Sequence, residues 1–317
     1  MDPKIFSNFI VAVGAVVPIF ILITIGLIIK KLQLLTPVEL NHVNRMVFRV
    51  FFAIMMFYNV YHADFTVPIH LSLLAFAGLG VVAMCIIFTA IIMVIEPSNK
   101  RRGAMSQAIW RSNFVLLGIP VVANIFGDDN VVVPTVLISV VIPVYNVLAV
   151  FVLETFRGGS FALWPILRGV LTNPMIDGLI VGFLFQGLGL TLPKPVVKPL
   201  AQIAAATSPI ALIILGASFT VNALVAEKKQ LIFCVVSRLL LVPGIMLPLA
   251  ALCGFRGIEF VSLIAVFATP CAVASYAMAQ QMGSDGPLAG NCVIITSALS
   301  CFTIFAWIFV SKMLGMF

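Results

Sequence analysis

The polar side chains best placed to do chemistry lie inside a segment that is otherwise apolar enough to cross a membrane. Pro270 interrupts this segment early, and Ser275, Tyr276 and Gln280 follow it. A proline in a spanning helix removes one backbone donor and leaves a carbonyl that lipid cannot satisfy. Such a break persists where it faces protein or a water-filled cavity, so this segment predicts a polar site at membrane depth.

A matching interruption lies in the first half of the chain. Residues 112–127 read SNFVLLGIPVVANIFG, with Gly118 and Pro120 in the middle of an apolar run. Two interrupted spans at corresponding positions of two halves are the best pointer in a sequence to the substrate site of a transporter. We therefore expect the segments around Pro120 and Pro270 to meet near the middle of the bilayer.

The expected ligand of such a site is an anion. A helix that restarts at Pro120 or Pro270 presents free N–H groups and the positive end of its dipole toward the break, which favours a carboxylate. The alternative is that the two prolines only kink long helices. The predicted substrate-binding residues are Arg111, Ser112, Asn113, Gly118, Pro120, Asn124, Thr269, Pro270, Ser275, Tyr276 and Gln280.

Three charged residues fall inside apolar segments. Arg111 and Arg238 each have two alternatives: a charge-assisted hydrogen bond to the substrate, or a guanidinium that extends to the lipid headgroups. Asp177 is the one acid clearly inside a span, so it is neutral, pairs with a cation or faces water. A neutral carboxyl would suit proton coupling, whereas a position near the cytoplasmic interface would make Asp177 structural.

The composition identifies a polytopic membrane protein. Hydrophobic residues make up 62% of 317 and charged residues 9%, against about 25% charged residues in a soluble domain. The net charge of +7 is explained by loops that orient the chain in the membrane, so nucleic acid is not an expected partner. The six cysteines and three histidines lack the spacing of a metal or redox site, and no cofactor is expected.

Ten segments are long and apolar enough to cross a bilayer as helices. They cover approximately residues 7–29, 39–61, 69–95, 104–126, 131–155, 163–190, 199–222, 230–253, 259–281 and 288–312. Lys and Arg divide 13 to 5 between the two sides, out of 18. This bias predicts a multi-pass protein of the cell (inner) membrane with both termini extracytoplasmic.

The two halves are related at a fixed offset of 156 residues. At this offset Pro18, Gly26, Pro37, Gly127 and Asp129 fall on Pro174, Gly182, Pro193, Gly283 and Asp285. We therefore divide the chain into a first repeat of five helices, residues 1–156, and a second, residues 157–317. Because five is odd, the second repeat enters the membrane from the opposite side and is inverted.

Three glycines predict close contacts between helices. Gly178 and Gly182 form a GxxxG pattern in the sixth span, and Gly216 lies in the seventh. Small residues let helix backbones approach one another. We interpret all three as packing positions.

Four passages carry a resemblance to a known family. They are residues 16–37 (VVPIFILITIGLIIKKLQLLTP), 112–121 (SNFVLLGIPV), 208–219 (SPIALIILGASF) and 268–300, which begins ATPCAVASYAMAQQMGSDGPLAG. The chain resembles the auxin efflux carrier family and, within it, the bacterial malonate-type transporters. The resemblance implies ten helices in two inverted repeats, with the fourth and ninth helices crossing at their prolines. It also implies a scaffold part and a transport part, each built from both repeats, and a homodimer would fit it.

The sequence departs from the family pattern in two places. Residues 47–60 lack the proline that is common in the second span, and residues 114–117 read FVLL where the plant hormone carriers are richer in Gly and Asn. The second departure argues against auxin as the substrate.

The function expected from these observations is secondary transport of a small organic anion by alternating access. No GxxxxGK[ST] loop is present, so protons or the membrane potential are the expected driving forces. The expected partners are the anion, protons and membrane lipid. The chain has no HExxH or GxSxG motif, and an enzyme is not expected. A passive anion channel or a membrane sensor is the alternative.

Overall fold

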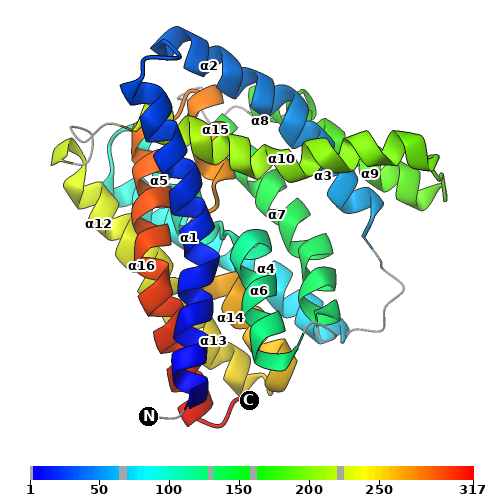
Figure 1. The fold of residues 1–317 in the computed structure, drawn as a ribbon, viewed down its shortest axis with the longest axis vertical. Coiled ribbons are helices and arrows are strands. Elements are labelled where there is room, and N and C mark those ends of the chain that lie inside the picture. The colour runs from blue at the N-terminus through cyan, green and yellow to red at the C-terminus, as the bar shows by residue number, and fades with distance from the viewer. Residues whose placement is uncertain (1–2, 64–69, 128–130, 158–162, 220–224) are drawn as a thin grey trace.

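A computed structural model describes residues 3–63, 70–127, 131–157, 163–219 and 225–317 (Figure 1). Within these ranges every regular element is a helix, and the one strand-like pairing is an isolated antiparallel bridge. The prediction of an all-α protein is confirmed. Asp129, used above to align the halves, lies outside the described residues.

The described helices follow one another with short connections. In the first half they are α1 (Pro3–Lys31), α2 (Pro37–Met46), α3 (Phe52–Tyr61), α4 (Leu71–Ile95), α5 (Asn99–Trp110), α6 (Phe114–Phe126) and α7 (Val132–Arg157). In the second half they are α8 (Leu163–Leu171), α9 (Pro174–Gly187), α10 (Lys194–Ser218), α12 (Lys228–Val236), α13 (Val242–Leu252), α14 (Gly257–Ala268), α15 (Ala274–Gln281) and α16 (Gly286–Met313). One π-helical turn joins α2 to α3 (η1, Val47–Phe51) and another joins α12 to α13 (η3, Ser237–Leu241).

Six helical segments in the described part of the chain are long and apolar enough to cross a membrane. They are Pro37–Tyr61, Leu71–Ile95, Val132–Arg157, Lys194–Ser218, Lys228–Leu252 and Gly286–Met313. Shorter apolar helices include α6, α9 and α14. A polytopic membrane protein is therefore the class that these helices support.

Local signals fix where several helices begin. Thr36 and Glu39 form a reciprocal capping box at the start of α2, whose first residue is Pro37. The side chain of Asn173 accepts from the N–H of Met175 at the start of α9, and that of Asp285 accepts from the N–H of Leu288 at the start of α16. These caps satisfy N–H groups that a helix leaves without partners.

The predicted glycine contacts are confirmed. A Cβ on Gly26 of α1 would lie 2.1 Å from the carbonyl oxygen of Ile213 in α10, and one on Gly216 would lie 2.1 Å from that of Ile23. In α9, a Cβ on Gly178 would lie 2.2 Å from the carbonyl oxygen of Ala53 in α3. Two helix pairs, α1 with α10 and α9 with α3, therefore touch backbone to backbone.

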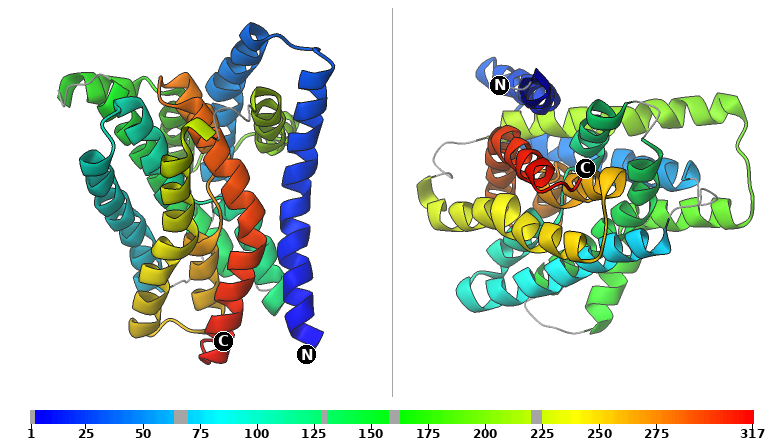
Figure 2. Two further views of the ribbon diagram at one scale, coloured as in Figure 1. Left: turned by 90° about the vertical axis from the view of Figure 1, so that its left-hand side faces the viewer. Right: turned by 90° about the horizontal axis from the view of Figure 1, so that it is seen from below.

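The long helices take two orientations. In Figure 1, α1 and α16 run side by side down the molecule, whereas α9 and α10 run across them near the end where α2 lies. The left view of Figure 2 shows α10 nearly end-on beside the upright α1. Both termini lie at the end opposite α2. The structure does not establish the ten membrane spans predicted from the sequence. They are part of the function proposed below.

Candidate functional site

Short irregular segments separate α5 from α6 and α14 from α15. We call each such segment a break and each helix pair a broken helix, and the two breaks are bonded to each other. α5 ends at Trp110 and α6 begins at Phe114, while α14 ends at Ala268 and α15 begins at Ala274. Both connecting segments have extended backbone, and they form the antiparallel bridge between residues 112 and 271.

Main-chain hydrogen bonds link the breaks. The N–H of Asn113 donates to the carbonyl of Pro270 over 2.8 Å, and the N–H of Ala272 donates to the carbonyl of Arg111 over 3.2 Å. Each break thus supplies partners for polar groups that the other has released from its helix. Non-helical backbone at membrane depth is tolerated where protein satisfies it in this way.

One of the two prolines lies where it was predicted and the other does not. Pro270 is in the second break, directly after Thr269, which ends α14. The interpretation that the first helix restarts at Pro120 is wrong, because Pro120 lies inside α6, whose first residue is Phe114. The first break falls at residues 111–113, where no proline marks it.

Arg238 covers the carboxyl ends of both broken helices. It lies in the π-helical turn η3, and its side chain is completely buried. Its guanidinium donates to five main-chain carbonyls at 2.7–3.3 Å, those of Ile109, Trp110, Val266, Phe267 and Thr269. Neither alternative from the sequence holds for Arg238, since it neither extends to the headgroups nor lines the cavity described next. It instead places a cation at the negative ends of two helix dipoles.

Arg111 is the first residue of the first break, and it is also buried. Its side chain is 4% exposed, and its guanidinium donates to the Asn146 Oδ1 over 2.6 Å and contacts the Met278 sulfur over 2.6 Å. Among the described residues no carboxylate lies within 4.0 Å of it. A buried cation without a charged partner is costly, and an anion bound beside it would supply the missing charge.

A small cavity lies against Arg111. Its volume is about 80 Å³, which suits a solute of a few non-hydrogen atoms. Its lining includes Arg111, Ser112, Asn113, Phe114, Val115 and Leu116 from the first break and the start of α6, and Ala272, Val273 and Ala274 from the second. The remaining lining residues come from α3, α7 and α10.

The amino ends of two helices open into this cavity. Asn113 precedes the first turn of α6, and its side chain makes no capping hydrogen bond. The Asn113 Nδ2 is buried and has no partner in the structure. The first N–H groups of α6 therefore remain available. At the start of α15, on the same cavity wall, the N–H groups of Ser275 and Tyr276 already donate to the carbonyls of Ala272 and Val273 over 3.0 and 3.2 Å, so α15 contributes chiefly the positive end of its dipole. Positive helix ends and Arg111 act together as an anion-binding environment.

Tyr145 and Asn146 of α7 complete the cavity and were not predicted as site residues. The Tyr145 hydroxyl lies 2.9 Å from the Ser112 Oγ and donates to the carbonyl of Val266 over 3.3 Å, so it ties α7 to both broken helices. Asn146 holds Arg111. The available signal was the adjacent polar pair in the middle of an apolar span, two residues after Pro143.

Thr269 and Ser275 support the breaks from outside the cavity. The Thr269 hydroxyl donates to the carbonyl of Ala265 over 2.8 Å, and the carbonyl of Ser275 accepts from the Gln107 side chain over 2.9 Å. Both residues are buried. Their position is next to the cavity, but they are not part of its lining.

The other predicted residues of α6 and α15 lie elsewhere. A Cβ on Gly118 would lie 2.4 Å from the ring of Phe114, so Gly118 serves packing. Pro120 lines an outer apolar groove, and Asn124 is exposed at the end of α6. Tyr276 and Gln280 line a different cavity. Contact of these residues with a substrate stays a prediction.

Asp177 is exposed in the first turn of α9. It lines a separate polar cavity of about 570 Å³, whose charged lining residues are Arg49, Glu154, Arg157 and Asp177. A role for Asp177 in proton coupling stays a prediction.

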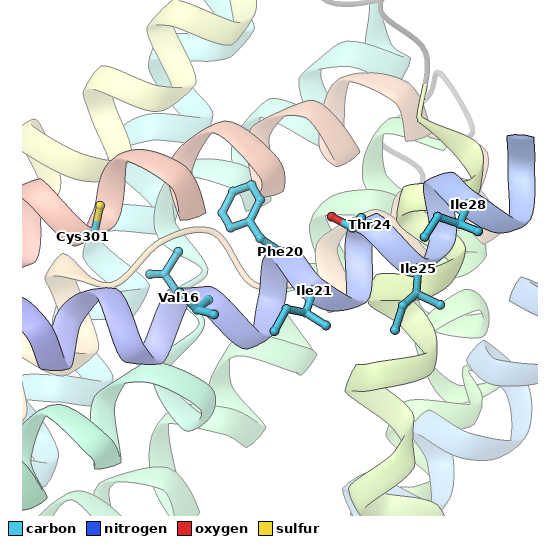
Figure 3. A pocket seen from close by; sticks show the side chains of 8 residues that line it. Val16, Phe20, Ile21, Thr24, Ile25, Ile28 and Cys301 are labelled. Carbon is cyan, nitrogen blue, oxygen red and sulfur yellow. The ribbon is translucent and has the colours of Figure 1, made fainter.

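A groove on the outside of the molecule, larger than the cavity at Arg111, is almost entirely apolar. It has a volume of about 540 Å³ and follows α1, with Cys301 of α16 opposite (Figure 3). Among the described residues of its walls, Thr24 alone carries a hydroxyl. Lipid chains suit such a surface, and it offers nothing that would bind an anion.

An ionic cluster joins the halves outside the spans. The Arg101 guanidinium lies 3.9 Å from Glu96, 3.2 Å from Glu227 and 3.9 Å from Asp285. Burial, together with the neighbouring Asp285, raises the pKa of Glu227 to about 7, and Arg101 opposes this rise. Three carboxyls thus share one cation.

The sequence was compared with known protein families and curated proteins. A family model described as "Membrane transport protein" matches twice, over residues 11–162 and 160–308. The chain belongs to this family, the auxin efflux carrier family. One relative is an "Uncharacterized transporter" of Methanothermobacter thermautotrophicus. It is 23% identical to the chain over 301 residues, which cover 92% of the chain and 96% of the relative. An "Uncharacterized transporter MJ1031" of Methanocaldococcus jannaschii is 23% identical over 239 residues, 72% of the chain and 76% of the relative.

Membership makes the chain a multi-pass protein of a transporter family. The resemblance inferred from the four passages is confirmed by the two matches, which together extend over nearly the whole chain. No substrate is stated in the names of these two relatives. The identity of the substrate therefore has to be argued from the site.

Proposed function

We propose that the chain is a secondary transporter of a small organic anion, a mono- or dicarboxylate such as malonate. The anion binds in the cavity between the two breaks, with its carboxylate at Arg111 and at the amino ends of α6 and α15. The observation that carries this proposal is the buried guanidinium of Arg111, which faces the cavity and has no carboxylate partner in the described residues.

The electrostatics of the breaks supports an anion over a cation. Arg238 covers the carboxyl ends of α5 and α14, so the negative ends of these helices are already neutralised. The amino end of α6 has no side-chain cap, and the amino end of α15 adds the positive end of a second helix dipole. A cation in the cavity would meet Arg111 and two positive helix ends, whereas a carboxylate would be stabilised by all three.

The same proposal includes ten spans in two inverted repeats, residues 1–156 and 157–317. Support comes from the two family matches and from equivalent packing in the two halves. Gly26 of α1 packs against the backbone of α10, and its counterpart Gly182 of α9 packs against Phe57 and Val60 of α3. The fourth and ninth spans are then α5 with α6 and α14 with α15, which cross at the bonded breaks.

Transport proceeds by alternating access in this proposal. Helices α1, α2, α3, α9 and α10 form the scaffold, and the broken helices with α4, α7, α12, α13 and α16 form the moving part. The cavity lies between the two, since α3 and α10 supply one wall and the breaks supply the other. Protons, through Asp177, or the membrane potential drive the movement, in a cell (inner) membrane with both termini extracytoplasmic.

Reconstitution in liposomes tests the proposal. The purified chain should take up labelled malonate or another short carboxylate with saturation, and a high internal concentration of unlabelled anion should accelerate uptake by counterflow. A flux that increases linearly with concentration and voltage would instead identify a passive channel. Absence of any anion flux, with a correctly folded protein, would leave a sensor as the remaining candidate.

A further inference from the structure

A further polar cavity, called the second cavity below, lies where α1, α2, α10, α15 and α16 meet. Its volume is about 380 Å³. Its lining residues are Lys30, Pro37, Leu40, Asn41, Asn44, Ala217, Ser218, Tyr276, Gln280 and Pro287. It is larger than the cavity at Arg111, and it is the place to which the structure assigns Tyr276 and Gln280.

Asn44 is a buried polar side chain in the wall of this cavity without a partner. It is 1% exposed, and neither its Nδ2 nor its Oδ1 has a hydrogen-bond partner in the structure. An amide buried in this state has lost its hydrogen bonds to water without gaining others, which is unfavourable. A ligand in the cavity that both accepts and donates hydrogen bonds, or a ligand with bound water, would satisfy it.

The other polar groups of the wall can all donate hydrogen bonds. Lys30 is the one charged residue of the lining, and its ammonium donates to the carbonyl of Phe219 at the end of α10. It forms no ion pair with any described acid. Gln281 donates to the Asn41 Oδ1 over 3.2 Å, which uses the acceptor of Asn41 and leaves its amide N–H groups for a ligand.

Two helices connect this cavity to the one at Arg111. Ser208 of α10 lines the first cavity and Ser218 lines the second, ten residues or about 15 Å farther along the helix. Ala274 lines the first and Gln280 the second, about 9 Å apart along α15. The second cavity therefore lies between the same two groups of helices, displaced toward the Lys30 end of the molecule.

We propose that this cavity is a second binding site for the transported carboxylate, in which Lys30 and Asn44 hold the anion before it enters, or after it leaves, the site at Arg111. This inference rests on the proposed function for the identity of the anion. The lysine supplies the charge, and the buried amide supplies a hydrogen bond that is otherwise unused. Tyr276 and Gln280 face the same ligand from α15, which belongs to the moving part, so the site also contacts both groups of helices.

Calorimetric titration of the full chain in neutral lipid nanodiscs tests the inference, with malonate, acetate and succinate as probes. Three variants separate the two cavities. Arg111→Met removes the first site, Lys30→Gln combined with Asn44→Leu removes the second, and Lys31→Gln is the control because Lys31 is not part of the lining. Gln at position 30 retains a donor for Phe219, and Leu at position 44 replaces an amide that has no partner, so both changes leave the fold intact.

The expected result is two binding events in the chain and in the Lys31 control, and one in each site variant. The Lys30/Asn44 variant should lose the event that Arg111→Met retains, with at least a tenfold rise in its dissociation constant. One event that disappears in Arg111→Met and is unchanged in the Lys30/Asn44 variant would overturn the second site while the proposed function stands. No binding by the unmodified chain would overturn both. Binding that appears only when anionic lipid is added would assign the cavity to a headgroup and would also overturn the inference.

Discussion

The N–H of Asn113 donates a 2.8 Å hydrogen bond to the carbonyl of Pro270, two residues separated by nearly half the chain. This bond and the one from Ala272 to Arg111 join the irregular segments of two broken helices. Because these segments satisfy one another, their side chains can be directed to a small cavity without leaving backbone polar groups exposed in the membrane. The site thus depends on both halves of the chain at once.

Arg238 is predicted to hold the two breaks together. Arg238→Met would leave five carbonyls at the ends of α5 and α14 without their donor, at roughly 3 kcal/mol or more in total. Arg238→Lys keeps the charge but supplies fewer donors in a less suitable geometry. The midpoint of thermal unfolding in detergent should therefore be highest for the unmodified chain, lower for Arg238→Lys and lowest for Arg238→Met. The rate of transport in liposomes should decrease in the same order. A Met variant as stable as the unmodified chain would contradict this role.

Gly216 is predicted to tolerate no larger side chain. Gly216→Val would place its Cβ against the backbone of Ile23 and push α1 away from α10. The expected effect is a loss of several kcal/mol of stability, the range for forcing atoms into a packed contact. Gly187→Val is the matched control, because nothing lies within 4 Å of a Cβ at that position. Thermal midpoints of the two variants should separate clearly, and equal midpoints would show that α1 and α10 are not in close contact.

Glu227 is predicted to make stability depend on pH. Its pKa is about 7 in the folded protein, above the ordinary value of 4.5, mainly because of burial and then Asp285. The folded chain therefore binds this proton more strongly than the unfolded chain, and the contribution of Glu227 to stability falls as pH rises from about 4.5 to about 7. Above that range it stays constant at its low value.

Glu227→Gln removes this titration, because the amide remains neutral. The variant should match the unmodified chain near pH 4.5 and should unfold at a higher temperature at pH 8. Thermal scans at half-unit steps between pH 4.5 and 8 measure the difference. Two curves that stay parallel across the whole range would show that Glu227 has an ordinary pKa in the folded state.

Much of the fold could be predicted from the sequence because the signals are local. Apolar length gave the helices, and the small residue at position 216 gave a helix contact. Pro270 marked the second break correctly, since a proline removes a donor whatever surrounds it. The four passages of family resemblance are likewise readable without coordinates, and the two family matches confirm them.

The first break could not be placed in the same way, because its cause is tertiary. Residues 111–113 contain no proline, and they leave the helix because partners from elsewhere bind them: the carbonyl of Pro270, the hydroxyl of Tyr145 and the side chain of Asn146. The role of Arg238 could not be predicted either, since its five acceptors come from the ends of two helices that are distant in the sequence. Spacing along a single helix carries no information about such contacts.

Substitution of Arg111 tests most directly whether an anion binds between the two breaks. Malonate binding and uptake should be measured for the unmodified chain, for Arg111→Met, and for Arg168→Met as a control. Arg168 is exposed, and it lines neither the cavity between the breaks nor the cavity at Asp177. Loss of a charge-assisted hydrogen bond of roughly 1.5–3 kcal/mol predicts a roughly 10- to 150-fold weaker affinity in Arg111→Met. Its thermal midpoint should be unchanged or higher, because a buried cation without a charged partner has been removed. Unchanged affinity and uptake in a folded Arg111→Met protein would contradict an anion site between the two breaks.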